Sequence, residues 1–383
     1  MFDFDNPLDR SGTGSIKWQA AGGDRLAMGL ADMDFRTAPP IIEALRARAD
    51  HGVLGYTQAG PGFFDAIVGW VEIRRGWPIK HEWITPCPGI MPSMAHLLRA
   101  TLEPGDGVIV QSPAFSPIPV IVEQNGLRVI DQPLLLAGTR YQMDVDAFQA
   151  AAQQPDVRAF VLCSPHNPMG RVWSRNELAV IADIAATNDL LVISDEIHAE
   201  IVHPWAEFVS YGAVASDSSR FAILFGPSKG FNLPGLRTSA AVIPHAGLRR
   251  DFHTELHRVN EDFGINVMGA VALEAAYSRG AEWLDALGAY LEANLEVVQS
   301  LAAERLPGVN VITPDASFLV WLDCRGRGLS DQELRERIAD RAGVVVEYGV
   351  SFGLTGSGFI RLNIGTQRGR VIASIERMGL ALR

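Results

Sequence analysis

The stretch Leu190-Leu-Val-Ile-Ser-Asp-Glu-Ile-His198 decides the fold, because an uncharged, mostly apolar run leads directly into two carboxylates. A nearly continuous apolar run of this length is typical of a strand that is covered on both faces of a parallel sheet. Similar runs lie on either side of it, at residues 107–111, 159–163, 221–225 and 239–243. Each of them predicts a strand of the same sheet.

Helical patterns separate these strands. In residues 174–187, for example, Ser174 is followed by Glu177, which is the spacing of a capping box at the start of a helix. The alternation of strands and helices predicts an α/β fold, with a large, doubly wound and mostly parallel sheet.

The pattern changes after about residue 260. A long helical region at 267–305, interrupted by Gly280, is followed by predicted strands at 310–312 and 318–322, a helix at 331–342 and a strand at 344–347. This order predicts a smaller α+β domain. We therefore expect an N-terminal segment, residues 1–45, that contributes to the small domain and the active site. A large domain at 46–275 and a C-terminal small domain at 276–383 would follow.

Composition excludes several classes of protein. The net charge of −11, from 33 basic and 44 acidic residues, and the lack of any Lys/Arg cluster argue against binding to nucleic acid or to anionic membranes. No run of about 18 apolar residues predicts a membrane span. Residues 1–10 carry three Asp and lack the pattern of a secretory signal. The three cysteines are far apart and odd in number, which favours a reducing cytoplasm.

Three predicted strands deliver polar side chains to one edge of the sheet. Asn167 follows the strand at 159–163, Asp195 ends the next strand, and Lys229 follows the strand at 221–225. Ligands of open α/β sheets bind outside the carboxyl ends of the strands. Each of the three residues alone has an ordinary structural explanation, but their ordered occurrence on successive strand ends favours a common site.

An amine, a carboxylate and an amide together suit pyridoxal phosphate. The cofactor's aldehyde condenses with a lysine, its ring nitrogen is kept protonated by a facing carboxylate, and its phenolic oxygen accepts from a neutral donor. Its phosphate requires backbone N–H groups at the start of a helix and a cation. An aromatic side chain stacks on the ring. Candidates for the last two tasks are Gly89, Ile90, Met91, Ser228, Arg237 and Phe115.

His253 and His257 lie one helical turn apart but lack an evident third ligand, so no metal site is predicted.

The sequence resembles the pyridoxal-phosphate enzymes of fold type I, and specifically the MalY/PatB-type cystathionine β-lyases, which are C–S lyases. The strings Ser164-Pro-His-Asn-Pro168, Ser194-Asp-Glu-Ile-His198 and Ser228-Lys-Gly-Phe-Asn232 carry this resemblance in order and spacing. Lys17-Trp18 and Asp32-Met-Asp-Phe35 favour the lyase branch over ordinary aminotransferases.

The resemblance implies a role for each matching residue. Lys229 would bind the cofactor and act as the catalytic base, with Asp195 at the ring nitrogen and Asn167 and His198 near the ring oxygen. Arg361 would bind the substrate carboxylate, and Trp18 and Phe35 would shape the substrate pocket. Tyr56 would reach a partner subunit's cofactor or substrate and take part in catalysis. A homodimer with shared active sites is therefore implied, acting on a small amino acid.

Departures from the family pattern leave the reaction open. Gln19 follows Lys17-Trp18 where an acidic residue is common, Phe115 replaces a tyrosine, and Gly226 stands where a serine often binds phosphate. Our favoured hypothesis is elimination of a thiol from a β-substituted amino acid, with release of pyruvate and ammonia. The alternatives are transamination, to which Arg237 and Phe115 lend weight, and a regulatory or binding protein on the same scaffold.

Overall fold

The computed structural model of the chain describes residues 2–10 and 12–383. Met1 and Ser11, both in the predicted N-terminal segment, lie outside the described residues. None of the described helices is long and apolar enough to cross a membrane.

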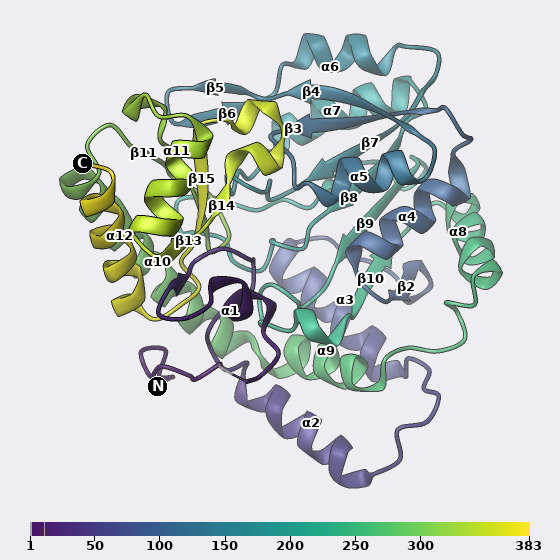
Figure 1. The fold of residues 1–383 in the computed structure, drawn as a ribbon. Coiled ribbons are helices and arrows are strands. Elements are labelled where there is room, and N and C mark those ends of the chain that lie inside the picture. Colours follow the sequence, from purple (N-terminus) through teal and green to yellow (C-terminus); the bar gives the residue numbers. More distant parts are fainter. Residues whose placement is uncertain (1, 11) are drawn as a thin grey trace.

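A seven-stranded sheet forms the centre of the molecule (Figure 1). Its strands, in spatial order, are β2 (Ile84–Cys87), β10 (Ser239–Val242), β9 (Phe221–Phe225), β8 (Leu191–Asp195), β7 (Val157–Cys163), β3 (Gly107–Ser112) and β4 (Arg128–Pro133). All are parallel except β10, which runs antiparallel to both of its neighbours. The predicted mostly parallel sheet is thus confirmed. Burial on both faces gives β10 the same apolar pattern as the parallel strands.

Alternate residues of each strand enter two separate apolar cores. Val192 of β8 packs on one face, whereas Ile193 packs on the other. The first face is covered by α3 (Pro61–Arg75), α6 (Val145–Ala152), α7 (Arg175–Thr187) and α9 (Val267–Arg279). The second is covered by α4 (Ile90–Thr101), α5 (Pro117–Gln124) and α8 (Ala246–Arg258). The capping box that Ser174 predicts is present at the start of α7.

The strand order reverses between β3 and β7, which are neighbours in the sheet although β4 follows β3 in the chain. Such a reversal opens a crevice at the carboxyl ends of the two strands, where α/β proteins bind their ligands. The loops after β3 and β7 carry Phe115 and Asn167, so the topology brings both to this crevice.

The C-terminal part is built on a four-stranded antiparallel sheet. Its order is β11 (Asn310–Ile312), β12 (Leu319–Asp323), β15 (Phe359–Asn363) and β14 (Glu347–Tyr348), and α10 (Ala281–Arg305) and α12 (Arg368–Ala381) pack beside each other against it. Gly280 separates α9 from α10, as expected. The predicted domain boundary at 275/276 falls inside α9, and the domain limits stay a proposal.

Two predictions for this part need correction. The strand expected at 344–347 is two short strands, because β13 (Val344–Val345) pairs with β1 (Leu26–Ala27) while β14 pairs with β15. In place of the single helix expected at 331–342, α11 covers Asp331–Arg335 and a wider π-helical turn follows over Glu336–Arg341. A pattern of apolar residues does not reveal with which partner strand each half of the run pairs.

Two further helices and a two-stranded hairpin lie outside these sheets. They are α1 (Ile16–Ala21), α2 (Pro39–His51), β5 (Leu135–Ala137) and β6 (Arg140–Gln142).

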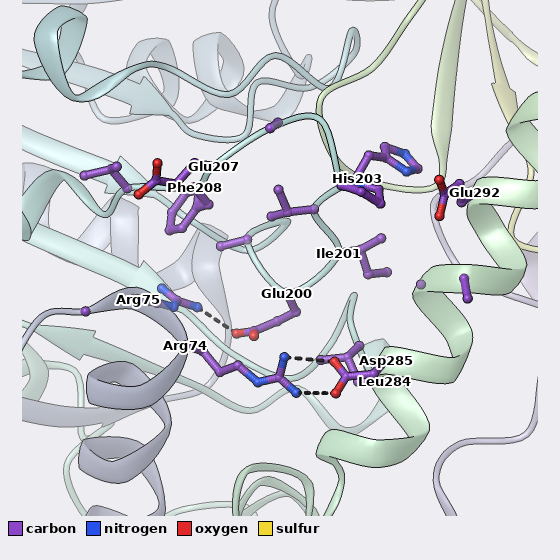
Figure 2. A pocket seen from close by; sticks show the side chains of 18 of the residues that line it. Arg74, Arg75, Glu200, Ile201, His203, Glu207, Phe208, Leu284, Asp285 and Glu292 are labelled. Atoms are coloured by element: carbon purple, nitrogen blue, oxygen red, sulfur yellow. Dashed lines mark hydrogen bonds and ion pairs between the residues drawn. The ribbon is translucent and has the colours of Figure 1, made fainter.

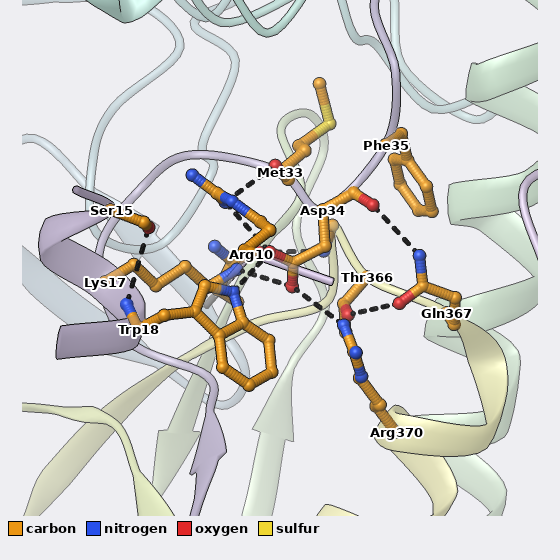
Figure 3. Close-up of polar contacts among 12 residues, drawn as sticks. Arg10, Ser15, Lys17, Trp18, Met33, Asp34, Phe35, Thr366, Gln367 and Arg370 are labelled. Atoms are coloured by element: carbon orange, nitrogen blue, oxygen red, sulfur yellow. Dashed lines mark hydrogen bonds and ion pairs between the residues drawn. The ribbon is translucent and has the colours of Figure 1, made fainter. Parts of the chain in front are cut away.

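A buried ionic cluster fixes the N-terminal segment to the C-terminal part (Figure 3). The Asp34 carboxylate accepts from the Arg10 guanidinium at 2.9 Å, the Lys17 ammonium at 3.0 Å and the Trp18 indole at 2.9 Å. Although burial acts in the opposite direction, these partners hold the pKa of Asp34 below its ordinary value. Arg370 of α12 lies over the Trp18 ring, which joins the two parts.

Candidate active site

A cavity of about 280 Å³ lies at the carboxyl ends of the central strands. Most of the residues that the sequence analysis singled out line it: Gly89, Ile90, Met91, Phe115, Asn167, Asp195, His198, Ser228, Lys229, Arg237 and Arg361. The fold therefore brings together residues from five segments at the carboxyl ends of strands in the large sheet and from β15 of the small sheet.

Lys229 and Asp195 form the charged centre of this cavity. Burial, reinforced by the nearby Arg361 cation, lowers the pKa of Lys229 to about 8. Its Nζ donates a hydrogen bond to the Ala31 carbonyl at 2.7 Å. Burial raises the pKa of Asp195 to about 7, although the Ile197 N–H and the Lys229 charge act against it. A cation placed beside Asp195 would therefore be strongly favoured.

Asn167 and Arg361 are joined across the two sheets. Arg361 Nη1 donates to Asn167 Oδ1 at 2.8 Å, and Arg361 Nη2 lies 3.4 Å from Glu347 Oε1. The guanidinium is buried over the Phe352 ring, and burial lowers its pKa. Because the amide oxygen of Asn167 accepts from a cation, its remaining polar group is an NH₂ donor.

His198 is a neutral imidazole at the wall of the cavity. Burial, together with the Lys229 and Arg361 cations, lowers its pKa well below the ordinary value. Its Nδ1 pairs with Ser317 Oγ at 2.9 Å. A neutral histidine fixed in this way can form a hydrogen bond to a ligand in the cavity but contributes no charge.

The start of α4 provides an anion site. Gly89, the N-cap, has φ of 138°, a conformation that side chains rarely adopt, and Ile90 and Met91 follow as the first helical residues. Backbone N–H groups at such a helix start have no partners within the helix and favour a phosphate. Ser228 and Arg237, from the turn region after β9, line the same cavity.

Three predicted site residues lie outside the cavity. The Tyr56 side chain is 91% exposed, and its ring packs edge-on against the Phe263 ring, with 4.9 Å between the ring centroids. Trp18 belongs to the Asp34 cluster, and Phe35 is buried between Phe4 and Tyr290. Trp18 and Phe35 therefore do not contact the cavity directly, because the indole N–H and both rings are used in fixing the N-terminal segment.

Sequence reasoning missed Ala31 and Glu347, whose polar groups contact Lys229 and Arg361. Ala31 contributes a backbone carbonyl to Lys229, which no side-chain pattern could reveal. Glu347 faces Arg361 because β14 and β15 pair in register, and the predicted strand at 344–347 was the only signal for it. Side chains of Asn232 and Asn363 bond the backbone of residues 30–35 and hold Ala31 in place.

A larger cavity, of about 640 Å³, contains none of the predicted residues (Figure 2). Two of its arginines are paired with carboxylates: Arg74 binds Asp285, and Arg75 binds Glu200 at 2.7 Å. A third, Arg175, donates to the Ala213 carbonyl. Arg75 also binds the buried Glu196, the residue after Asp195, at 2.9 Å. The two ion pairs of Arg75 fix the turn that follows Asp195. Among residues 2–10 and 12–383, no cluster of His, Cys, Asp or Glu is arranged for a metal ion.

The residues of the smaller cavity fit pyridoxal phosphate. An amine with a pKa near 8, a buried carboxylate, an amide donor, an aromatic ring and a helix start line one space. This donor set matches the aldehyde, ring nitrogen, ring oxygen, ring face and phosphate of the cofactor in turn.

A doubly wound sheet with this site defines a fold type I enzyme, the class that uses pyridoxal phosphate. The chain belongs to the aminotransferase class I and II family, whose model matches residues 25–375.

Similar proteins narrow the class further. The chain is 38% identical to the cystathionine β-lyase PatB of Bacillus subtilis (strain 168), over 99% of this chain and 100% of the relative. It is 32% identical to the protein MalY of Escherichia coli (strain K12), over 100% and 99% of the two chains. The crystal structure of the PLP-bound C–S lyase of Staphylococcus hominis superimposes with a TM-score of 0.93 and 28% identity, over 100% and 99%. The predicted resemblance is thus confirmed.

Proposed function

We propose that this protein is a pyridoxal-phosphate-dependent C–S β-lyase. It would release a thiol, pyruvate and ammonia from an amino acid that carries sulfur on its β-carbon. The observation that carries this proposal is the single cavity that joins Lys229 and Asp195 to the buried Arg361. The cystathionine β-lyase and C–S lyase among the similar proteins support this reaction over others of the family.

Arg361 is suited to bind the substrate carboxylate. Its guanidinium is 2% exposed, faces the cavity, and can form two parallel hydrogen bonds to a carboxylate. Its Nε lacks a hydrogen-bond partner among the described residues. A bound carboxylate would accept hydrogen bonds from this buried guanidinium. The substrate would then be held with its α-carbon toward Lys229.

Lys229 removes the α-proton, for which a pKa of about 8 leaves part of the amine uncharged near neutral pH. When bound, pyridoxal phosphate supplies a protonated ring that takes up the electron pair left on the α-carbon. Asp195 provides the negative charge that favours this protonated ring. The electron pair from the α-carbon then forms a double bond to the β-carbon as the C–S bond breaks. The sulfur leaves with the electrons of that bond and takes a proton from Lys229 or from the Tyr56 that a partner subunit would contribute. The remaining fragment takes up water and leaves as pyruvate and ammonia.

A product assay tests this function. We expect cystathionine and S-alkyl cysteines to yield thiol and pyruvate in equal amounts, over many turnovers and without any keto acid. Elimination regenerates the enzyme in each cycle, whereas transamination requires a keto acid to do so. Transamination is the second candidate, because the matching family model is that of aminotransferases. Amino transfer to an added keto acid without sustained pyruvate release would favour it and contradict our proposal.

We further propose a homodimer in which Tyr56 acts on the partner's site. The exposed side chains of Val53, Leu54, Tyr56 and Phe263 support an interface at this surface, since exposed apolar groups gather where partners bind. The exposure of Tyr56 agrees with a role outside its own subunit.

Mixing two variants tests this arrangement. Lys229→Ala and Tyr56→Phe each impair their own homodimer, but a mixed dimer holds one site with both native residues. After subunit exchange we expect activity to recover to about a quarter of the wild-type value, because half of randomly paired dimers are mixed. Activity of only about half that of the Tyr56→Phe homodimer, which is what dilution by inactive Lys229→Ala subunits gives, would place Tyr56 in its own subunit's site or in none.

We also propose a cytoplasmic location. Cys87, Cys163 and Cys324 are all unpaired and buried, which suits a reducing compartment.

The predicted limits of the large domain at 46–275 and the small domain at 276–383 remain part of the proposal.

A further inference from the structure

Glu347 is a charged residue of the cavity to which the mechanism above gives no role. Antiparallel pairing of β14 and β15 sets it directly opposite Arg361, so both side chains leave the sheet on the same face. The Glu347 side chain is 31% exposed and that of Arg361 is 2% exposed. The carboxylate therefore stands on the solvent side of the guanidinium, at the mouth of the cavity.

The position of Glu347 lies on the path of a long substrate. Glu347 and Leu30 line both this cavity and a neighbouring one of about 580 Å³. A molecule held at Arg361 that extends beyond the first cavity would therefore pass the Glu347 carboxylate.

The charge at the far end of a substrate decides whether it is favoured beside Glu347. A substrate carboxylate at Arg361 shares that cation with Glu347, so these three groups together carry one negative charge in excess. Of the cations that line the neighbouring cavity, Lys17 pairs with Asp34, Arg25 pairs with Asp340, and Arg335 lies over the Tyr348 ring. A second anion on the substrate would add to this repulsion, and an ammonium group would offset it. We propose that Glu347 is a specificity-determining residue, which favours β-thioether amino acids with an ammonium group at the far end of the side chain. This inference rests on the proposed function.

Three substrates that differ at the far end test it. We expect S-(2-aminoethyl)-L-cysteine to have a kcat/KM about tenfold above S-propyl-L-cysteine, as one charge-assisted hydrogen bond allows, and S-carboxymethyl-L-cysteine to be poorer than both. In Glu347→Gln the first ratio should fall to near one, mainly through KM, and S-propyl-L-cysteine should bind as well or better. Glu347→Asp, which keeps the charge, should retain part of the preference.

Binding without turnover separates this inference from the proposed function. L-Lysine, L-2-aminoheptanoate and L-2-aminoadipate have no leaving group, and their dissociation constants follow from quenching of tryptophan fluorescence. The wild type should prefer lysine about tenfold and Glu347→Gln should not, even if no thiol is released from any substrate. Asp340→Asn, which removes an exposed carboxylate from the neighbouring cavity, should leave the preference unchanged. A wild type that binds the three compounds equally, or a preference that survives in Glu347→Gln, would overturn the inference.

Discussion

Replacement of Lys229 by Ala is expected to abolish covalent cofactor binding and to lower pyruvate release by about 10³-fold or more, because one amine serves as anchor and as base. The chain contains only three lysines, Lys17, Lys80 and Lys229, which makes the assignment direct. Borohydride reduction followed by peptide mapping should locate the cofactor on Lys229 in the wild type and on no lysine in the variant.

The pKa of Lys229 gives this prediction a pH dependence. Only the uncharged amine attacks the aldehyde, and burial together with Arg361 lowers the pKa from 10.5 to about 8. The rate of cofactor capture by the apoprotein should therefore rise between about pH 7 and pH 9 and then level off. Lys80→Ala, which changes an exposed lysine beside Trp83, is the matched control and should behave as the wild type. Retention of the reduced cofactor's near-ultraviolet absorbance by Lys229→Ala after borohydride treatment and dialysis would contradict the assignment.

Replacement of Asp195 by Asn is expected to lower pyruvate release by about 10²–10³-fold, the usual cost of losing one oriented group that stabilises developing charge. An amide has nearly the same shape and can still accept from the Ile197 N–H, so the turn after β8 should persist. What is lost is the negative charge that keeps the ring nitrogen protonated. Steady-state kinetics and the absorbance of the bound cofactor would both report this loss.

Asp189→Asn is the matched control for this experiment. Asp189 lies before the other end of β8, is exposed, and has a positive φ that asparagine tolerates. Activity of Asp195→Asn within about threefold of the control would show that the carboxylate does not carry the expected electrostatic role.

The central part of the fold and of the site could be predicted from the sequence because local patterns determine them. Each buried strand leads into a polar residue that the topology carries to one edge, so the order of strands and polar residues is enough to bring Asn167, Asp195 and Lys229 together. The capping box of α7 and the break at Gly280 are local signals of the same kind.

Long-range pairing accounts for what could not be predicted. β13 pairs with β1, which is far away in the chain, whereas β14 pairs with β15, which follows soon after it. An apolar run does not reveal this change of partner, on which the position of Glu347 opposite Arg361 depends. Trp18 and Phe35 belong to motifs of the lyase branch, yet they pack into the N-terminal segment instead of the cavity. A motif identifies a residue that matters but does not tell whether it touches the ligand or supports a segment that does.

The hydrogen bond from Lys229 to the Ala31 carbonyl has a consequence for biosynthesis. Residues 30–35 are held by Asn232, by Asn363 and, through the Asp34 cluster, by Arg370, all of which lie far away in the chain. The segment that faces Lys229 is therefore in place only after these distant parts of the chain have packed together. Vitamin B6 loading then follows tertiary folding, and chains in which this segment is detached should remain colourless.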